Sequence, residues 1–352
     1  MVFGKRDHLV GLDIGSTCIK VAELKISKKG NVLQKFGMAP VASGAIVEGR
    51  IADRDGLAET IRNLFKSQKI KEKNVAISTG GHSVVIKTIS TAKATDKELH
   101  KSIRSEAEQY IPYDIDDVNI DYQVLGESEF SPDQVNVLLV AVKQNLVAEY
   151  MDLIKTAGLN PSIIDVDTFA LQNIFEALPD MDPEEVTLLV DVGASKISLN
   201  ILKDNTSTMM RDMMVGVSQI IETIADRFGM DMDQATQVLE GGAREGVDHQ
   251  ALEEICQSAT AGWCAEICEV VHTFESNANN MQVEKLLLSG GGSYLQSLSD
   301  GLSKELDVPV LKLNPFTAIE VDPKRFSSEM IEKTGLQAAI ALGLSLRRVD
   351  DK

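Results

Sequence analysis

The sequence predicts an α/β fold with two related lobes and a smaller α+β unit inserted into the first lobe. A strand, a tight turn and a second strand around Asp13 recur around Asp191, which indicates an internal repeat. Between the two copies, residues 84–163 form a separate run of short strands and helices. A chain of 352 residues that is 43% apolar and 25% charged is long enough for two hydrophobic cores.

Charge and cysteine content narrow the class of protein. The formal net charge of −18 argues against nucleic-acid binding through overall electrostatic attraction. No apolar run reaches the length of a membrane-spanning helix, so we expect membrane association only through a partner. The four cysteines follow no signal peptide, which favours a reducing cytoplasm. Cys264 and Cys268 lie one helical turn apart, where they can share a metal, but this spacing without a second pair is more typical of a helix core.

The first hairpin is predicted from an apolar run ending at Ile14, a short turn, and an alternating run from Ile19 to Leu24. Gly15 permits a tight turn, and the hydroxyls of Ser16 and Thr17 with nearby backbone NH groups can surround a phosphate oxygen. Asp13 is expected at the mouth of the hairpin. Taken alone, the same pattern is also typical of a plain surface hairpin.

The rest of the first lobe is predicted from hydrophobic periodicity. A third strand is expected at 32–36, an amphipathic helix at 57–65 and a buried strand at 75–78. A glycine turn at 79–82 follows, near the carboxyl ends of the strands, and its His82 is expected to be a loop residue without catalytic chemistry.

The inserted unit has its own pattern of elements. Strands are expected at 84–89, 118–125 and 135–142, and helices at 96–110 and 146–157. The first helix has a cap at Thr95 or Asp96, and its charged face is expected to be solvated. A connecting helix within 163–177 then returns to the first lobe.

The second hairpin repeats the first from Leu188 to Leu202. Aligned on the aspartates, Gly193 matches Gly15 and Ser195 matches Thr17, which predicts two related halves facing each other across a cleft. Helices are expected after Gly216, at 232–240 and at 249–277, where the single Trp263 is expected in the core.

A third turn follows the strand at 284–289 and consists of three consecutive glycines before a helix. Such a turn lets a planar or anionic ligand approach the backbone, although a tight strand-to-helix connection explains it equally well. A strand at 308–313 and a helix of small residues at 335–346 are expected to complete the chain.

The three turns together resemble the actin-like ATPase superfamily of actin, the sugar kinases and the Hsp70 chaperones, in which two phosphate hairpins hold a nucleotide between two lobes. This resemblance implies an actin-like two-lobed ATPase fold with duplicated ribonuclease-H-like cores. It implies a first phosphate loop of Asp13, Gly15, Ser16 and Thr17, a second of Asp191, Gly193, Ala194 and Ser195, and an adenosine motif of Gly290, Gly291 and Gly292. Residues 165–172 and 335–346 match the two connecting helices.

The expected cofactors are ATP and Mg²⁺. A Mg²⁺–triphosphate needs hard oxygen ligands, usually through water, which places Asp13 and Asp191 on the metal side. Gly216 and Glu222 are further expected nucleotide contacts. Residues 235–239 depart from the family pattern and lose a lysine that could flank the adenine.

Within the superfamily the chain resembles the PilM family of type IV pilus assembly proteins, on the segments Ser105–Gly126 and Ala157–Asn173. The related FtsA family usually ends in an amphipathic membrane helix, whereas residues 347–352 read RRVDDK. The resemblance implies that the N-terminal cytoplasmic tail of a PilN-like inner-membrane protein lies between the first lobe and the inserted unit, near Val84–Ile89 and the strands up to Val142. The protein is then expected to be cytoplasmic and peripheral to the inner membrane, with contacts to other platform proteins and self-association left open.

The expected organisation follows from these assignments. Residues 1–83 form the N-terminal part of the first lobe, 84–163 the inserted unit, and 164–185 the first connecting helix. Residues 186–314 form the second lobe with its nucleotide-binding subdomain, and 315–352 a return that includes the second connecting helix.

The leading hypothesis is an ATP-binding component of the type IV pilus inner-membrane platform, whose nucleotide state sets how its lobes present partner surfaces. Weak ATP hydrolysis is left open, because no general base for an attacking water is identified. The alternatives are an FtsA-like cell-division or cytoskeletal protein, and a small-molecule kinase or activase of the same fold. An acceptor pocket or an Fe–S cysteine set would favour the kinase or activase, and the sequence indicates neither.

Overall fold

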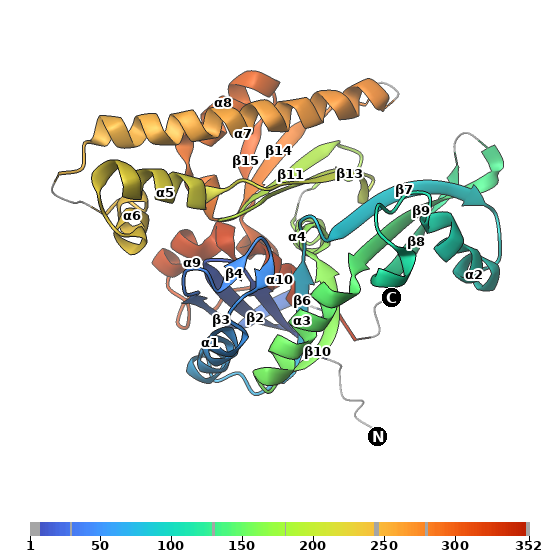
Figure 1. Ribbon diagram of the computed structural model, residues 1–352, viewed down its shortest axis with the longest axis horizontal. Helices are drawn as coiled ribbons and strands as arrows, with labels where there is room; N and C mark the ends of the chain where they lie inside the picture. Colours follow the sequence, from blue (N-terminus) through green and yellow to red (C-terminus); the bar gives the residue numbers. More distant parts are fainter. Residues whose placement is uncertain are drawn as a thin grey trace.

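Two five-stranded sheets with the same strand arrangement form the centres of two lobes, which are stacked in Figure 1. The computed structural model describes residues 8–28, 30–128, 131–179, 181–242, 246–278 and 281–349. The first sheet has the order β10-β6-β1-β2-β3 and the second β13-β12-β11-β14-β15. In both sheets the first three strands in sequence are antiparallel and the last two add in parallel, so the repeat predicted from the two hairpins is confirmed.

The strands of the two sheets correspond one to one. The first sheet contains β1 (Val10–Ile14), β2 (Cys18–Ser27), β3 (Gly30–Pro40), β6 (Asn74–Thr79) and β10 (Asn160–Val166). The second contains β11 (Thr187–Val192), β12 (Ile197–Lys203), β13 (Thr206–Met213), β14 (Lys285–Ser289) and β15 (Val310–Lys312). The sequence did not predict β13, whose residues are less apolar and whose burial is mixed because it lies at a sheet edge.

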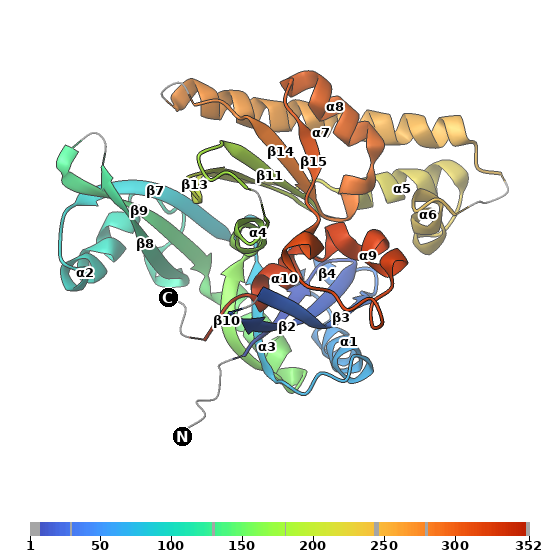
Figure 2. The same ribbon diagram turned by 180° about the vertical axis from the view of Figure 1, so that it is seen from behind.

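The inserted unit is a three-stranded antiparallel sheet with a helix on one face, seen beside the two lobes in Figures 1 and 2. Its strands are β7 (Val84–Ala92), β8 (Val118–Ser128) and the central β9 (Ser131–Lys143). Helix α2 (Asp96–Ala107) packs there through Leu99 and Ile103. Of the two caps that the sequence allows, Thr95 and Asp96, the helix begins at Thr95, which forms a capping box with Glu98, and the 3₁₀ turn η1 (Ile115–Asp117) leads into β8.

Helix α3 (Gln144–Thr156) departs from the expected organisation. It packs with α1 (Arg54–Ser67) in the core of the first lobe, and its Tyr150 hydroxyl donates to the carbonyl of Gly49, 3.3 Å away, between the short strands β4 (Ile46–Val47) and β5 (Arg50–Ile51). Strand β10 likewise pairs with β6. The expected end of the insertion at residue 163 conflicts with this packing, because the apolar faces of α3 and β10 are buried in the first lobe. We therefore propose that the inserted unit ends with β9.

The helices of the second lobe pack on and beside the second sheet, with α7 and α8 above it and α5 and α6 at its side in Figure 1. They are α5 (Val217–Phe228), α6 (Met232–Leu239), α7 (His249–Asn277) and α8 (Gln296–Leu306). Trp263 and Cys264 of α7 are buried in the apolar cluster beneath them, and the predicted core position of Trp263 is confirmed. None of the described helices combines the length and apolarity needed to cross a bilayer.

Two connecting helices cross between the lobes near the centre of Figures 1 and 2: α4 (Asp167–Glu176) and α10 (Ala339–Ser345). A methyl group on Gly343 would lie 1.8 Å from the carbonyl oxygen of Ala170, so only a glycine allows this close approach. The second helix was expected from residue 335, but residues 335–337 form the 3₁₀ turn η4 (Gly335–Gln337). The Leu336 carbonyl there accepts hydrogen bonds from the Gly290 amide (2.7 Å) and the Ser289 hydroxyl (3.2 Å) instead. The neighbouring short elements are η2 (Gly291–Tyr294), η3 (Pro315–Ala318) and α9 (Ser328–Thr334).

Candidate functional site

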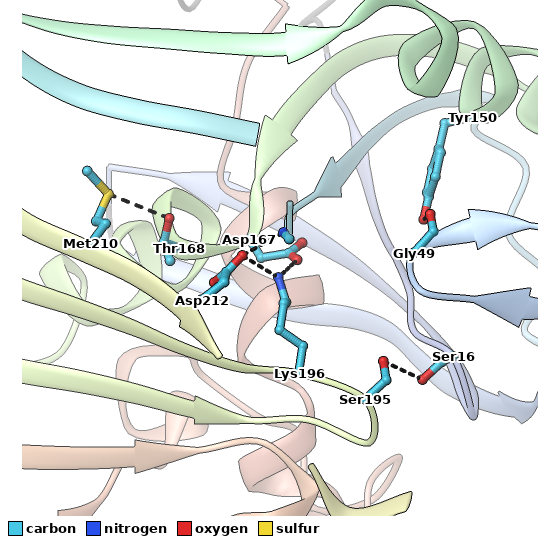
Figure 3. Close-up of polar contacts among 10 residues, drawn as sticks. Ser16, Gly49, Tyr150, Asp167, Thr168, Ser195, Lys196, Met210 and Asp212 are labelled. Carbon is cyan, nitrogen blue, oxygen red and sulfur yellow. Dashed lines mark hydrogen bonds and ion pairs between the residues drawn. The ribbon is translucent and has the colours of Figure 1, made fainter. Parts of the chain in front are cut away.

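The turns of the two predicted phosphate hairpins meet between the lobes. The Ser16 hydroxyl of the first hairpin donates to the Ser195 hydroxyl of the second across 3.1 Å, although 179 residues separate them (Figure 3). Each turn is closed in the same way, because the Gly15 amide donates to the Cys18 carbonyl (3.2 Å) and the Gly193 amide to the Lys196 carbonyl (2.9 Å). Hydroxyl groups from both lobes therefore meet at one point.

Two aspartates and a lysine lie on the strands that support these turns. Asp13 stands opposite Lys20 in the β1–β2 register, and its carboxylate lies 3.0 Å from the Lys20 ammonium. Asp191 occupies the matching place on β11. Burial and the nearby charge of Asp13 raise the pKa of Asp191 to about 6, and burial also raises the pKa of Asp13. The two hairpins thus hold two carboxylates where each charge is poorly solvated.

This pair of carboxylates fits a divalent cation. Hard oxygen donors are what Mg²⁺ prefers, and a nearby cation would relieve the burial and repulsion that raise the pKa of Asp191. The sequence analysis did not single out Lys20, which supplies the positive charge beside Asp13. Its cross-strand position opposite Asp13 in a hairpin with a three-residue turn is the signal that would have identified it.

The predicted glycine motifs lie at the base of the second hairpin. A methyl group on Gly216 would lie 2.6 Å from the carbonyl oxygens of both Gly193 and Ala194, and one on Gly290 would lie 2.5 Å from that of Val192. The first amides of α5 also bond this turn, since the amide of Val217 donates to Gly193 (3.1 Å) and that of Ser218 to Ala194 (2.8 Å). Gly292 is equally close to the Val192 side chain, whereas Gly291 is exposed. Close backbone packing on the hairpin therefore accounts for Gly216, Gly290 and Gly292 without a ligand.

Two predicted nucleotide contacts, Thr17 and Glu222, have side chains that lie outside the group formed by the hairpin serines and the two aspartates. Thr17 is exposed, and its carbonyl accepts a hydrogen bond from the Val41 amide at 2.9 Å. Glu222 is exposed on α5, and within the described part of the chain no contact joins it to either hairpin. Their assignment to the nucleotide stays a prediction.

A network around Lys196 extends from the second hairpin to the first lobe (Figure 3). The Lys196 ammonium lies 2.7 Å from the Asp167 carboxylate, at the start of α4, and 3.3 Å from the Asp212 carboxylate on β13. Asp212 in turn accepts a hydrogen bond of 2.5 Å from the Gly81 amide in the loop after β6. Burial by itself lowers the pKa of Lys196, but Asp167 and Asp212 outweigh it and raise this pKa. Burial by itself raises the pKa of Asp167, but Lys196 outweighs it and lowers this pKa, so both groups are charged.

None of these network residues was predicted from the sequence to be functional. Asp167 was expected only as part of the connecting segment. Its nearness to the glycine turn follows from the position of both at the carboxyl ends of parallel strands, which was considered only for His82. Because β6 and β10 are parallel neighbours, the residues after Thr79 and Val166 emerge at the same edge of the sheet. Lys196 and Asp212 gave no such signal, since β13 was not predicted.

A cavity of 280 Å³ opens beside this network, between the edge strands β7 and β13 that lie next to each other in Figures 1 and 2. Val84 and Ile86 of the inserted unit, Thr168 of α4 and Met210 of β13 line it together with Lys196. His82 also lines the cavity, and its carbonyl accepts a hydrogen bond of 2.5 Å from the Tyr113 hydroxyl. The first lobe, the second lobe and the inserted unit thus all contribute residues to this cavity.

The repeated sheets, the paired hairpins and the crossed connecting helices define an actin-like protein of two lobes. The particular family is shown by a family model described as type IV pilus assembly protein PilM, which matches residues 11–349. The chain therefore belongs to the PilM family.

Solved structures agree with this assignment. A PilM–PilN type IV pilus biogenesis complex is similar with a TM-score of 0.88 and 29% identity, covering 98% of this chain and 100% of that chain. The ethanolamine utilization protein EutJ from Carboxydothermus hydrogenoformans has a TM-score of 0.57 and 12% identity, covering 95% and 89%. MreB 5 of Spiroplasma citri, solved with AMPPNP bound, has a TM-score of 0.52 and 12% identity, covering 94% and 98%. The latter two share the fold and confirm the actin-like class that the sequence predicts.

Proposed function

We propose that this member of the PilM family binds Mg-ATP between its two hairpins and binds the cytoplasmic tail of a PilN-like inner-membrane protein beside its inserted unit. Its place is then the cytoplasmic face of the inner membrane, where the partner anchors it. The nucleotide and the tail are separate ligands, and each is tested on its own.

The observation that carries the nucleotide proposal is the meeting of Ser16 and Ser195 in front of Asp13, Asp191 and Lys20. Two hydroxyl groups from opposite lobes can donate to one phosphate oxygen, and the Lys20 ammonium balances phosphate charge beside them. Mg²⁺ held through water by Asp13 and Asp191 would neutralise the remaining charge of the phosphates. That MreB 5, which has the same fold, was solved with AMPPNP bound supports a nucleotide as the ligand.

The partner proposal rests on family membership and on the similarity to the PilM–PilN complex. The 280 Å³ cavity bordered by β7, β13 and α4 has apolar walls at Val84 and Ile86, which suit apolar side chains of an extended tail. Val84 and Ile86 belong to the segment 84–89 that the family resemblance implies as part of the tail site.

Isothermal titration calorimetry with Mg-ATP tests the nucleotide proposal. Asp13→Asn keeps the shape of the side chain but removes its charge, and we expect at least a tenfold loss of Mg-ATP affinity, about 1.4 kcal/mol. Asp121→Asn, an exposed change on β8, serves as the matched control and should leave the affinity unchanged.

Two results would contradict this proposal. The first is a wild-type chain that does not bind Mg-ATP, and the second is an affinity that Asp13→Asn leaves unchanged. Transfer of phosphate to a small acceptor in the same mixture would instead favour a kinase.

A further inference from the structure

The loop between β6 and β7, residues 80–83, is in contact with all three parts of the molecule. Its Gly81 amide donates to Asp212 of the second lobe at 2.5 Å. On the side of the inserted unit, the Tyr113 hydroxyl donates to the His82 carbonyl at 2.5 Å, and the Lys143 amide donates to the Ser83 carbonyl at 3.1 Å. The loop then continues directly into β7, so its position fixes where the inserted sheet begins.

Lys196 joins this loop to the second phosphate hairpin. It follows Ser195 in the chain, and its carbonyl closes the hairpin turn by accepting from the Gly193 amide. In Figure 3 its side chain extends away from Ser195 toward Asp167 and Asp212. A methyl group on Gly80 would lie 2.1 Å from the Lys196 ammonium, which therefore rests directly against the loop backbone.

We propose that Lys196 is a positioning residue that couples the second phosphate hairpin to the inserted unit, so that nucleotide binding changes the affinity for the partner tail. This inference rests on the proposed function and adds a residue through which its two ligands influence each other. Lys196 acts through Asp212 and the loop, and it does not itself contact the nucleotide.

The proposed coupling requires the second hairpin to move when nucleotide binds, and the spacing of the hairpin tips indicates such a movement. Ser16 and Ser195 are bonded directly at 3.1 Å. Two hydroxyls that each donate to one phosphate oxygen at roughly 2.7 Å must stand about 4.5 Å apart. Binding a phosphate there therefore breaks the direct Ser16–Ser195 bond, and in the proposed coupling the two tips separate by roughly 1 Å to admit the phosphate oxygen. Lys196 belongs to the same turn as Ser195, so its backbone must move with the tip.

The contacts of Lys196 are too short to absorb this movement unchanged. Asp167 belongs to α4 in the first lobe, so a shift of the hairpin changes its 2.7 Å ion pair with Lys196. Asp212 stands opposite Ser198 in the β12–β13 register and moves with the second lobe, and it carries the Gly81 amide with it. The loop and the start of β7 are thereby displaced relative to α4, where Val84 and Ile86 line the cavity proposed for the tail.

A purely structural ion pair would behave differently from a coupling residue. Removing a structural pair lowers stability but leaves the ratio of tail affinities with and without nucleotide unchanged. Removing a coupling residue brings that ratio toward one. The ratio is therefore the quantity to measure.

The experiment measures binding of a fluorescent synthetic peptide, the N-terminal tail of the PilN-like protein, to the full chain with and without saturating Mg-AMPPNP. For the wild-type chain we expect at least a fivefold change in the dissociation constant. In Lys196→Met the change should fall below about twofold, and because Lys196 itself lines the cavity, this ratio and not the tail affinity alone is compared with the wild type. Lys203→Met is the matched control, because this lysine lies at the far end of the strand that follows Lys196 and donates to the Glu184 carbonyl, and it should keep the full change.

A second variant guards against a general folding defect. Asp212→Asn retains an oxygen that can accept from Gly81 but loses the charge that faces Lys196, and it should reduce the ratio as Lys196→Met does. Hydrogen exchange of residues 80–92 should respond to Mg-AMPPNP in the wild type and not in either variant.

The possible failures are distinguishable. If the wild type binds neither Mg-AMPPNP nor the tail, the proposed function itself fails. If it binds both with a ratio of one, or if Lys196→Met keeps the wild-type ratio, the coupling role is overturned while the proposed function stands.

Discussion

Asp191 and Asp13 lie behind the hairpin tips, and their closeness in a buried site sets the chemistry of the cleft. Burial and the charge of Asp13 raise the pKa of Asp191 to about 6, even though Lys20 acts in the opposite direction. The Asp191 carboxyl consequently titrates within a pH range in which many proteins remain folded. An aspartate predicted from the repeat to lie on the metal side thus also has a measurable pH dependence.

Asp191 should make the free energy of unfolding fall as pH rises in metal-free buffer. Its pKa in the folded chain lies above the ordinary value of 3.8, so its stabilising contribution is present at low pH and lost as pH rises through about 6. Between pH 5 and 7.5 this loss amounts to about 1 kcal/mol. Urea unfolding of the wild type and Asp191→Asn in EDTA measures it, since the variant lacks the titrating group.

The control for this prediction is Asp300→Asn, an exposed change on α8. Its difference in stability from the wild type should be the same at both pH values. Identical pH profiles for the wild type and Asp191→Asn would show that this carboxyl does not titrate as its surroundings indicate.

The connecting helices α4 and α10 show how small residues position whole elements. Gly343 lies against the Ala170 carbonyl, and a methyl group on Gly11 of β1 would lie 2.0 Å from the Ala341 carbonyl. The two glycines therefore let α10 approach both α4 and the first sheet. The sequence predicted a closely packed helix of small residues here, and the structure identifies its contacts.

Gly343→Ala should destabilise the protein despite the higher helix propensity of alanine. Propensity favours alanine by about 1 kcal/mol, but a backbone oxygen at 1.8 Å cannot be avoided without separating the helices. We expect the net loss to be about 1–3 kcal/mol, the range for an overpacked core, measured by urea unfolding.

Gly262→Ala in α7 is the matched control. A methyl group there meets nothing within 4 Å in the described structure, so this change should stabilise the chain by about 0.5–1 kcal/mol. Equal effects of the two substitutions would contradict the packing of α10.

At the scale of the whole molecule, the cleft and the inserted unit are neighbours because both begin at the carboxyl edge of the first sheet. The loop after β6 leads into the inserted sheet, and α4 follows β10 at the same edge. A nucleotide between the hairpins and a tail beside β7 would therefore bind within one connected region. Lys196 lies between these two proposed binding places.

Ile86→Asp should weaken binding of the PilN-like tail at least tenfold, because it places a charge on the apolar wall of the cavity. Thr88→Asp, two residues further along the same face of β7 and exposed, should have little effect. Fluorescence anisotropy with the synthetic tail measures both. Equal affinities for wild type and Ile86→Asp would place the tail elsewhere.

Much of the fold was predictable because its signals are local. The two hairpins, the capping box at Thr95 and helix α7 follow from short patterns, and each is found where the sequence predicts it. The lobe to which α3 belongs was harder to predict, because periodicity reveals that a helix has an apolar face but not which core receives it.

By itself, the sequence determined the repeated hairpins, the aspartates behind them and the family to which the chain belongs. Only the tertiary structure decided that Ser16 meets Ser195, that Lys196 lies between Asp167 and Asp212, and that Gly81 bonds to Asp212, 131 residues away. The physical reason is that backbone propensity and hydrophobic periodicity act over a few residues, whereas these polar contacts depend on how separately formed lobes pack against each other.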